Sequence, residues 1–136
     1  MQTYVVGFLF SDDLSKVVLI RKKRPPYQEG LLNGVGGEIK VGEWKHDAMR
    51  REFLEETGHD HKEWREYACI SNANYKCFCY FGMSYDFDQV KTMTDEAVGI
   101  YEVKFLSSLS TLASVQWLVP LGLDKGHYYS ESEHNN

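Results

Sequence analysis

A chain of 136 residues fits one domain of common size, so one hydrophobic core is expected. Its 43% hydrophobic and 26% charged residues are close to the average for globular proteins, which excludes a disordered or collagen-like chain. The formal net charge of -5 argues against a dedicated binder of nucleic-acid polymers, because such proteins present a basic surface. It still permits a nucleotide substrate held through a bound cation.

No segment has the pattern of a signal peptide or a membrane span. The apolar run over residues 5–10 contains Gly7 and follows no basic region. We therefore expect a cytoplasmic protein with no membrane partner.

The cysteines favour packing over chemistry. Cys69, Cys77 and Cys79 are an odd number, and the last two lie two residues apart in a strand-like run, where they would share one face. No second Cys or His pair completes a zinc-binding spacing. Reduced packing residues are therefore favoured over a metal or redox pair.

Local sequence patterns predict six strands and two helices in chain order. Runs rich in β-branched and aromatic residues, separated by turn residues, predict strands over 3–10, 16–21, 32–39, 67–70, 75–85 and 97–106. The segment 44–57 lacks Gly and Pro and predicts a helix that ends at Gly58. A short second helix is predicted over 114–119, with Ser114 as its N-cap and Pro120 as its limit.

This order of elements predicts an α/β (α+β) fold, in which helices pack on a mixed sheet. We expect a single domain over residues 1–127. Residues 128–136 are polar and are expected to form a flexible C-terminal tail.

The predicted helix over 44–57 carries an unusual density of acid. Glu52, Glu55 and Glu56 would share an arc of roughly 100°, because a helix turns about 100° per residue. Like charges four residues apart cost about 0.2–0.5 kcal/mol, so a compensating partner is expected. Clustered carboxylates are the ligands that Mg²⁺ prefers. The alternative is a solvated acidic face paired with Arg50 and Arg51.

The residues around these glutamates follow a defined spacing. The pattern is Gly, five residues, Glu, seven residues, Arg-Glu, an aliphatic or aromatic residue, any residue, Glu-Glu, any residue and Gly. The matching positions are Gly37, Glu43, Arg51, Glu52, Phe53, Glu55, Glu56 and Gly58. This segment resembles the Nudix box, the signature of the Nudix hydrolases.

One position departs from the usual box. His59 stands where the family usually has an aliphatic residue, which puts the local packing in doubt more than the chemistry. His59 and His61 also flank Asp60 in a triplet that could bind a metal, although this interpretation is disfavoured.

The resemblance implies a Nudix-type α/β/α sandwich and a divalent cation, Mg²⁺ with Mn²⁺ as a possible substitute. In the family, the corresponding glutamates bind the cations, so Glu52, Glu55 and Glu56 are expected to be metal ligands and catalytic residues. Gly37 would offer a backbone carbonyl to the metal. One of the three glutamates, or a further Glu on a later loop, would orient the attacking water.

The resemblance also implies supporting roles. Arg51 would hold a box glutamate in place, and Glu43 would brace the loop. Glu96, just before a predicted strand, lies where many members carry an additional catalytic Glu; the alternative is a solvated loop acid. Arg24 and Lys23 follow the second strand, where relatives place phosphate-binding bases; a solubilising basic loop explains them about as well.

Two further segments resemble the MutT-type, oxidised-purine nucleotide hydrolases. Asn33 begins an Asn-Gly-x-Gly-Gly run in which the amide can read a purine edge, although Asn-Gly is also a strong turn signal. Trp117 lies in a segment similar to the Trp-containing segment of that subgroup and could line the base pocket. Ala113 and Ser114 stand where an Asn or Asp often completes base recognition.

These features predict an Mg²⁺-dependent hydrolase of a nucleoside diphosphate linked to another group. The favoured reaction converts a nucleoside triphosphate to monophosphate and pyrophosphate, with removal of oxidised purine nucleotides as a hypothesis. The alternatives are a hydrolase of ADP-ribose, nucleotide sugars or dinucleotides, and a non-catalytic Nudix-like nucleotide-binding regulator. A monomer and a homodimer both stay open.

Overall fold

A computed structural model of the chain describes the backbone of residues 1–135 and the side chains of residues 1–127. Its strands are β1 (Gln2–Ser11), β2 (Lys16–Arg21), β3 (Leu32–Asn33), β4 (Val35–Glu38), β5 (Arg65–Ser71), β6 (Tyr75–Ser84) and β7 (Val98–Glu102). The helices are α1 (Lys45–Thr57) and α2 (Val115–Asn135). Short 3-10 helices are η1 (Pro26–Gln28), η2 (Phe87–Gln89) and η3 (Val103–Ser108).

Strand β1 lies at the centre of a seven-stranded mixed sheet. It runs parallel to β6 over its whole length, with Gln2 opposite Tyr75 and Ser11 opposite Ser84. On its other edge, β4 pairs antiparallel with the first half of β1 and β2 with its end. Strand β5 extends the sheet beyond β6, while β3 and β7 both pair with β2.

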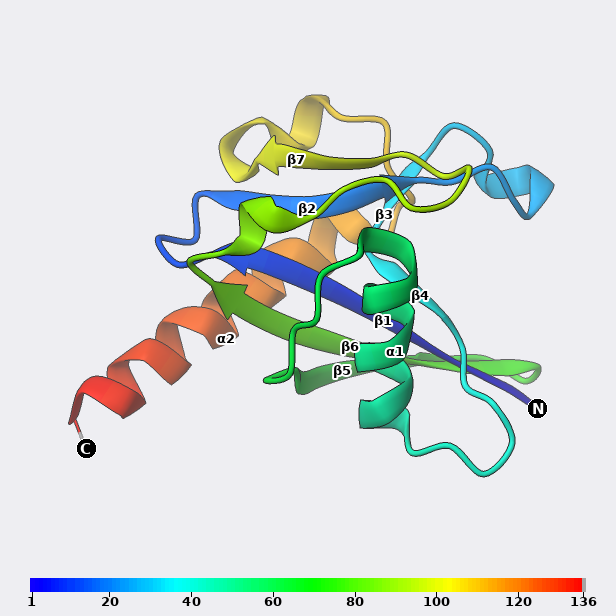
Figure 1. The fold of residues 1–136 in the computed structure, drawn as a ribbon, viewed down its shortest axis with the longest axis horizontal. Helices are drawn as coiled ribbons and strands as arrows, with labels where there is room; N and C mark the ends of the chain where they lie inside the picture. The colour runs from blue at the N-terminus through cyan, green and yellow to red at the C-terminus, as the bar shows by residue number, and fades with distance from the viewer. Residues whose placement is uncertain (136) are drawn as a thin grey trace.

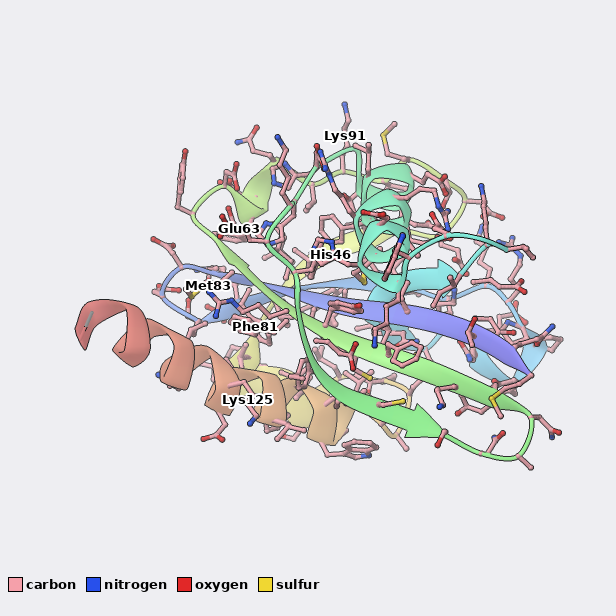
Figure 2. All side chains as sticks on the ribbon, turned by 90° about the horizontal axis from the view of Figure 1, so that it is seen from below. His46, Glu63, Phe81, Met83, Lys91 and Lys125 are labelled. Carbon is pink, nitrogen blue, oxygen red and sulfur yellow. The ribbon has the colours of Figure 1, made fainter. Side chains whose placement is uncertain are left out.

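The two α-helices cover opposite faces of this sheet (Figures 1 and 2). Strand β1 supplies side chains to both cores: Val5 and Leu9 pack on the α1 side, whereas Phe8 and Phe10 pack on the α2 side. Burial on both faces explains why β1 is an almost continuous apolar run rather than an alternating one. The predicted fold class and the three-layer arrangement are confirmed.

Most predicted elements exist close to their expected bounds. The strand predicted over 16–21 is β2, and the helix predicted over 44–57 is α1, which begins one residue later. The strand predicted over 32–39 is divided at Gly34 into β3 and β4, which pair with different neighbours. A Cβ on Gly34 would lie 2.8 Å from the carbonyl oxygen of Gly7, so the close backbone approach expected in this glycine-rich segment is present.

The strand predicted over 97–106 is too long. Strand β7 ends at Glu102, which pairs with Lys16, the first residue of β2. No partner strand continues past Lys16, so the chain turns into η3 and buries Leu106 in the core. Loss of the pairing partner therefore outweighs the strand propensity of the sequence.

The helix predicted over 114–119 is also too short. Helix α2 passes through Pro120 and continues to Asn135, and Pro120 lies on its exposed side. Packing against the sheet stabilises the helix on both sides of the proline, through Val115, Leu118 and Val119 before it and through the partly buried Leu123 after it. The tail expected over 128–136 lies outside the residues whose side chains are described. Within the described chain, no helix has the length and apolarity needed to cross a membrane.

Candidate active site

The box begins at a close contact between β4 and α1. Gly37 pairs with Val5 of β1 and lies directly beneath the side chain of Glu52. A Cβ on Gly37 would lie 2.4 Å from Cδ of Glu52, which is far inside van der Waals contact. Glycine therefore allows the backbone of the box to lie against a carboxylate of α1.

Arg51 fastens the loop before α1 to the helix. Its guanidinium donates through Nε to Oε2 of Glu43 at 2.7 Å and through Nη2 to Oε1 at 3.0 Å, and it also donates to Oε1 of Glu52 at 2.9 Å. Glu43 in turn accepts a bond from the backbone of Lys40 at 3.0 Å. Hydrogen bonding to Arg51 is the main cause that lowers the pKa of Glu43 below its ordinary value. The arrangement holds Glu52 against Gly37.

The C-terminal end of α1 is held by the loop that precedes β7. Gly58 ends the helix in the left-handed conformation, with φ of 73°, and donates to the carbonyl of Leu54 at 2.9 Å. The amides of Lys91 and Met93 donate to the carbonyls of Thr57 and Glu56 at 3.0 and 3.3 Å. Residues of this loop are thereby brought beside the glutamates of the helix.

The three box glutamates lie on one side of α1 but differ in their partners. Glu52 bonds to Arg51, Glu55 accepts from Arg51 at 3.2 Å, and Glu56 accepts from the Thr94 hydroxyl at 3.1 Å. Burial is the main cause that raises the pKa of both Glu52 and Glu56 above the ordinary value. Two carboxylates are therefore held where their negative charge lacks full hydration, which is an environment that favours a cation.

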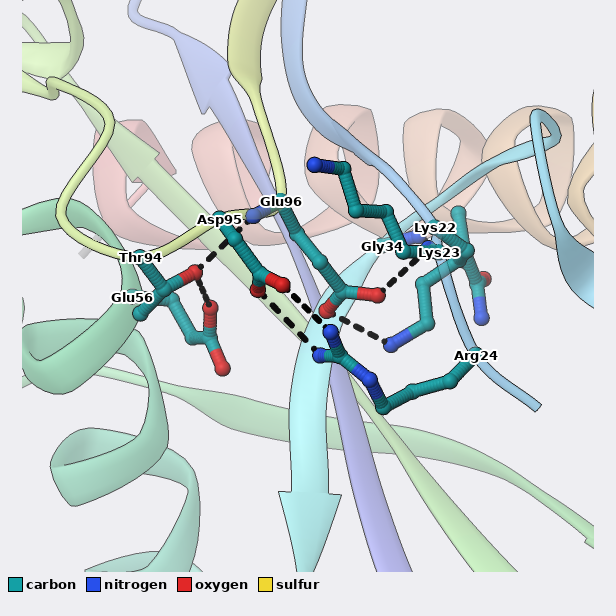
Figure 3. A network of polar contacts seen from close by, with 9 residues as sticks. Lys22, Lys23, Arg24, Gly34, Glu56, Thr94, Asp95 and Glu96 are labelled. Atoms are coloured by element: carbon teal, nitrogen blue, oxygen red, sulfur yellow. Dashed lines mark hydrogen bonds and ion pairs between the residues drawn. The ribbon is translucent and has the colours of Figure 1, made fainter.

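The segment Thr94–Asp95–Glu96 contacts three different parts of the site (Figure 3). Thr94 donates to Glu56, Asp95 pairs with Arg24, and Glu96 accepts from Nζ of Lys22 at 3.1 Å and the amide of Lys23 at 2.7 Å. Glu96 is only 4% exposed, so it is not the solvated loop acid of the alternative interpretation. Burial raises the pKa of Glu96, but the bonds from Lys23 and Lys22 outweigh it and the net shift is downward.

The basic residues after β2 do not all point into the solvent. Lys22 is tied to Glu96, and Arg24 donates through Nη1 to Oδ1 of Asp95 at 3.2 Å and through Nη2 to Oδ2. Lys23 is exposed, and its backbone amide is what contacts Glu96. The loop therefore brings two cationic side chains beside the segment that contacts Glu56 (Figure 3).

The residues expected to contact a base belong to β3 and α2, not to the helix that carries the glutamates. Oδ1 of Asn33 accepts from the amide of Gly34 at 2.8 Å, a local bond of the kind that the turn interpretation predicts. Trp117 is 52% exposed near the start of α2. The loop before α2 is joined to β3, because the amide of Leu112 donates to the carbonyl of Leu32 at 3.0 Å.

The donor chemistry of the site fits a hard divalent cation. The carboxylates of Glu52, Glu55 and Glu56 and the backbone carbonyl of Gly37 are all oxygen donors, as Mg²⁺ requires. As the side chains stand, no three His, Cys, Asp or Glu groups among residues 1–127 are gathered closely enough to hold a metal. Glu55 is turned to Arg51 and its side chain is 52% exposed, so it has space to rotate towards its neighbours.

The other candidate metal ligands are the two histidines near the end of α1 and the three cysteines. His61 is buried beside Trp64, whereas Nε2 of His59 lies 3.4 Å from Oδ1 of Asp86. Cys69, Cys77 and Cys79 are all free, and Cys79 is buried in the core on the α2 side. Within the described part of the chain, neither set forms a group that could hold a metal ion.

Comparison with known proteins identifies the family. The model of the NUDIX domain matches residues 1–117, so the chain belongs to the Nudix family. The chain is therefore of the Nudix hydrolase class. No curated protein matches the chain.

Solved structures of Nudix proteins share the fold. The MutT structure described for Aliivibrio salmonicida and Vibrio cholerae is 20% identical, with a TM-score of 0.78, and the match covers 91% of this chain and 98% of that one. The NUDIX domain of Shewanella oneidensis NrtR, complexed with ADP-ribose, is 16% identical with a TM-score of 0.79, covering 90% and 86%. A MutT Nudix hydrolase from Burkholderia pseudomallei is 17% identical with a TM-score of 0.75, covering 88% and 96%.

Sequence reasoning missed the contacts made by Thr94 and Asp95. Thr94 is 38 residues from Glu56, and Asp95 is 71 residues from Arg24, so no local spacing relates them. The only signal was their position next to Glu96, in a polar segment directly before a strand.

Proposed function

We propose that the chain is a divalent-cation-dependent pyrophosphohydrolase that converts a nucleoside triphosphate to the monophosphate and pyrophosphate. The observation that carries this proposal is the set of glutamates on one side of α1: Glu52 packs against Gly37, and Glu52 and Glu55 accept hydrogen bonds from Arg51. The carboxylates would hold Mg²⁺ or Mn²⁺, which neutralises phosphate charge and lowers the pKa of bound water.

The chain's own residues supply the remaining functions in this proposal. Glu52 and Glu56 would hold the cation through their carboxylate oxygens, and Glu96 is the further carboxylate that could orient the attacking water. Arg24 and Lys23 bind phosphate oxygens, while Asn33 and Trp117 contact the base. Arg51 keeps Glu52 oriented without touching the substrate.

The test is product analysis after incubation of the purified protein with Mg²⁺ and a substrate panel. The panel contains ordinary and 8-oxo nucleoside triphosphates, ADP-ribose, a nucleotide sugar, NADH and a dinucleoside polyphosphate. Monophosphate and pyrophosphate formed chiefly from triphosphates would support the proposal. Removal of oxidised purines is supported only if their kcat/KM exceeds that of ordinary triphosphates.

Hydrolysis of ADP-ribose is the second candidate. It is favoured by the similar fold of the Shewanella oneidensis NrtR domain, whose structure holds ADP-ribose. Formation of AMP from ADP-ribose, with little turnover of triphosphates, would select it. Nucleotide binding without turnover would instead support a regulatory domain. That alternative would be excluded if the wild type cleaves a substrate that the Glu56→Gln variant binds but does not cleave.

A further inference from the structure

The Arg24–Asp95 pair joins the loop after β2 to the segment before β7. Both nitrogens at the end of the Arg24 guanidinium face the two carboxylate oxygens of Asp95 (Figure 3). The side chains are 61% and 52% exposed, so neither is enclosed by the protein. The contact is therefore an open ion pair at the edge of the candidate active site.

We propose that Asp95 is a specificity-determining residue that occupies Arg24 in the free protein and is replaced there by a phosphate group of the substrate. This inference rests on the proposed function, in which Arg24 is a phosphate-binding residue. It adds a role for Asp95 as an internal competitor of the substrate.

The chemistry of the two partners supports an exchange. A planar guanidinium binds carboxylate and phosphate through the same pair of parallel hydrogen bonds, so Asp95 presents to Arg24 the geometry that a phosphate would present. Exposed ion pairs are weak because water and salt screen them. A phosphate chain carries more negative charge than one carboxylate and can therefore displace Asp95.

The neighbours of the pair keep Asp95 close to the site after the exchange. Thr94 is bound to Glu56, and Glu96 is bound to Lys22 and to the backbone of Lys23. With both flanking residues held, the backbone at Asp95 cannot move far. Its released carboxylate stays beside the bound anion and disfavours ligands that carry too little charge to outcompete it.

The consequence is a preference for polyphosphate over monophosphate ligands. When a single phosphate binds, it forms one contact with Arg24, but the Arg24–Asp95 pair is broken and the freed carboxylate repels the phosphate. A triphosphate makes further contacts through its other phosphates. Removing the charge of Asp95 should therefore strengthen the binding of all phosphates. It should also reduce the difference in affinity between polyphosphate and monophosphate ligands.

The experiment is calorimetric titration of the full chain with inorganic tripolyphosphate and with inorganic phosphate, at constant ionic strength and Mg²⁺. Asp95→Asn should tighten tripolyphosphate binding about two- to five-fold, the range expected when an exposed ion pair is removed. Arg24→Gln should weaken it about ten-fold or more, since a charge-assisted hydrogen bond is lost. In the Arg24→Gln background, Asp95→Asn should bring only a small gain.

The double variant separates competition from simple repulsion. If Asp95 acts only by repelling anions, Asp95→Asn gives the same gain with and without Arg24, and the proposal is overturned. It is also overturned if Asp95→Asn weakens binding, because Asp95 would then hold Arg24 in its binding position. Asp60→Asn is the matched control: Asp60 pairs with Arg50 through two bonds of 2.7 and 2.8 Å outside the site, and its loss should change nothing.

These results are independent of turnover. An Arg24-dependent gain in tripolyphosphate affinity, with no hydrolysis of any nucleotide, would support the exchange and reject the proposed function. Triphosphate hydrolysis by the wild type, with an unchanged affinity of Asp95→Asn for tripolyphosphate, would support the proposed function and reject the exchange. Failure of both wild type and Asp95→Asn to bind tripolyphosphate would overturn the exchange.

Discussion

Thr94 links two glutamates of the site through one hydroxyl group. Its Oγ1 donates to Glu56 at 3.1 Å and accepts from the amide of Glu96 at 3.2 Å. The hydroxyl therefore has no freedom to rotate away, and it fixes the direction of the Glu56 carboxylate. In the proposed function, Thr94 would therefore be a positioning residue rather than a catalytic one.

Replacement of Thr94 by Val should lower kcat/KM for the preferred substrate by about 10- to 100-fold, the usual effect of removing a partner that orients a metal-binding residue. Thr94→Ser keeps the hydroxyl and should retain most of the activity. Separate measurement of kcat and KM, together with Mg²⁺ titration, checks the role. A loss in Thr94→Ser as large as that in Thr94→Val would contradict this role, because Ser keeps the hydroxyl and lacks only the methyl group.

Gly36 and Gly37 are adjacent, yet alanine should affect them in different ways. A Cβ on Gly37 meets the flexible end of Glu52 at 2.4 Å, whereas a Cβ on Gly36 meets the backbone oxygen of Val5 at 1.9 Å. Gly37→Ala should therefore fold but lose activity, because Glu52 has to move. Gly36→Ala should lower the free energy of unfolding by about 3 kcal/mol, because the pairing of β4 with β1 is disturbed.

Thermal unfolding and kcat measured on both variants check this contrast. A Gly37→Ala variant with full activity would mean that Glu52 reaches its working position from more than one direction. A Gly36→Ala variant as stable as the wild type would mean that β4 can separate from β1 at no cost.

At the scale of elements, local sequence patterns predict those helices and strands whose bounds depend on local interactions. Helix α1 was predicted within one residue, because its bounds follow from helix propensity and from Gly58. The spacing from Gly37 to Gly58 is enough to identify the glutamates and Arg51 as candidate site residues, since all of them belong to one loop and one helix. The contacts of Asp95 and Thr94 depend on how distant loops pack, which no local pattern records.

Helix α2 shows the opposite case, in which packing overrides a local signal. Its continuation past Pro120 brings Gly122 and Gly126, four residues apart, onto the side that faces the sheet. A Cβ on Gly126 would lie 2.7 Å from the ring of Phe81, while one on Gly122 would lie no closer than 3.3 Å to Tyr67. The absent side chain at 126 allows the helix to approach β6.

Gly126→Ala should lower the free energy of unfolding by about 1–2 kcal/mol, because Phe81 is buried and cannot move aside. Gly122→Ala should change it by less than about 1 kcal/mol, since a gain in helix propensity offsets the tight contact. Denaturant unfolding of the two variants checks this. A more stable Gly126→Ala would show that α2 can shift outward without loss of core packing.

At the scale of the whole molecule, metal-free stability should depend on pH through Glu56. Burial raises its pKa in the folded state above the ordinary 4.5, so this glutamate favours folding less as the pH rises through that folded-state pKa. At pH values below the pKa of the unfolded state, the carboxyl group is protonated in both states and does not lower the free energy of unfolding. Glu56→Gln should therefore be more stable than the wild type at pH 7 without metal, and the gap should close as the pH falls towards 4.5.

Thermal melts at several pH values, with a chelator and with excess Mg²⁺, provide the measurement. Mg²⁺ at pH 7 should raise the Tm of the wild type more than that of Glu56→Gln, because bound ligand stabilises the folded state by mass action. Identical pH profiles for the two proteins would show that Glu56 does not carry the buried charge.

The parallel pairing of β1 with β6 also sets an order of assembly. The first strand of the chain is the centre of the sheet, but the edge of β1 that β6 covers stays open until residues 75–84 are available. A chain shortened before Tyr75 would expose a long apolar strand with free backbone groups, which is a template for aggregation. Pairing across such a sequence distance also slows folding relative to local contacts. Residues 1–74 therefore carry the complete box but cannot form a working unit on their own.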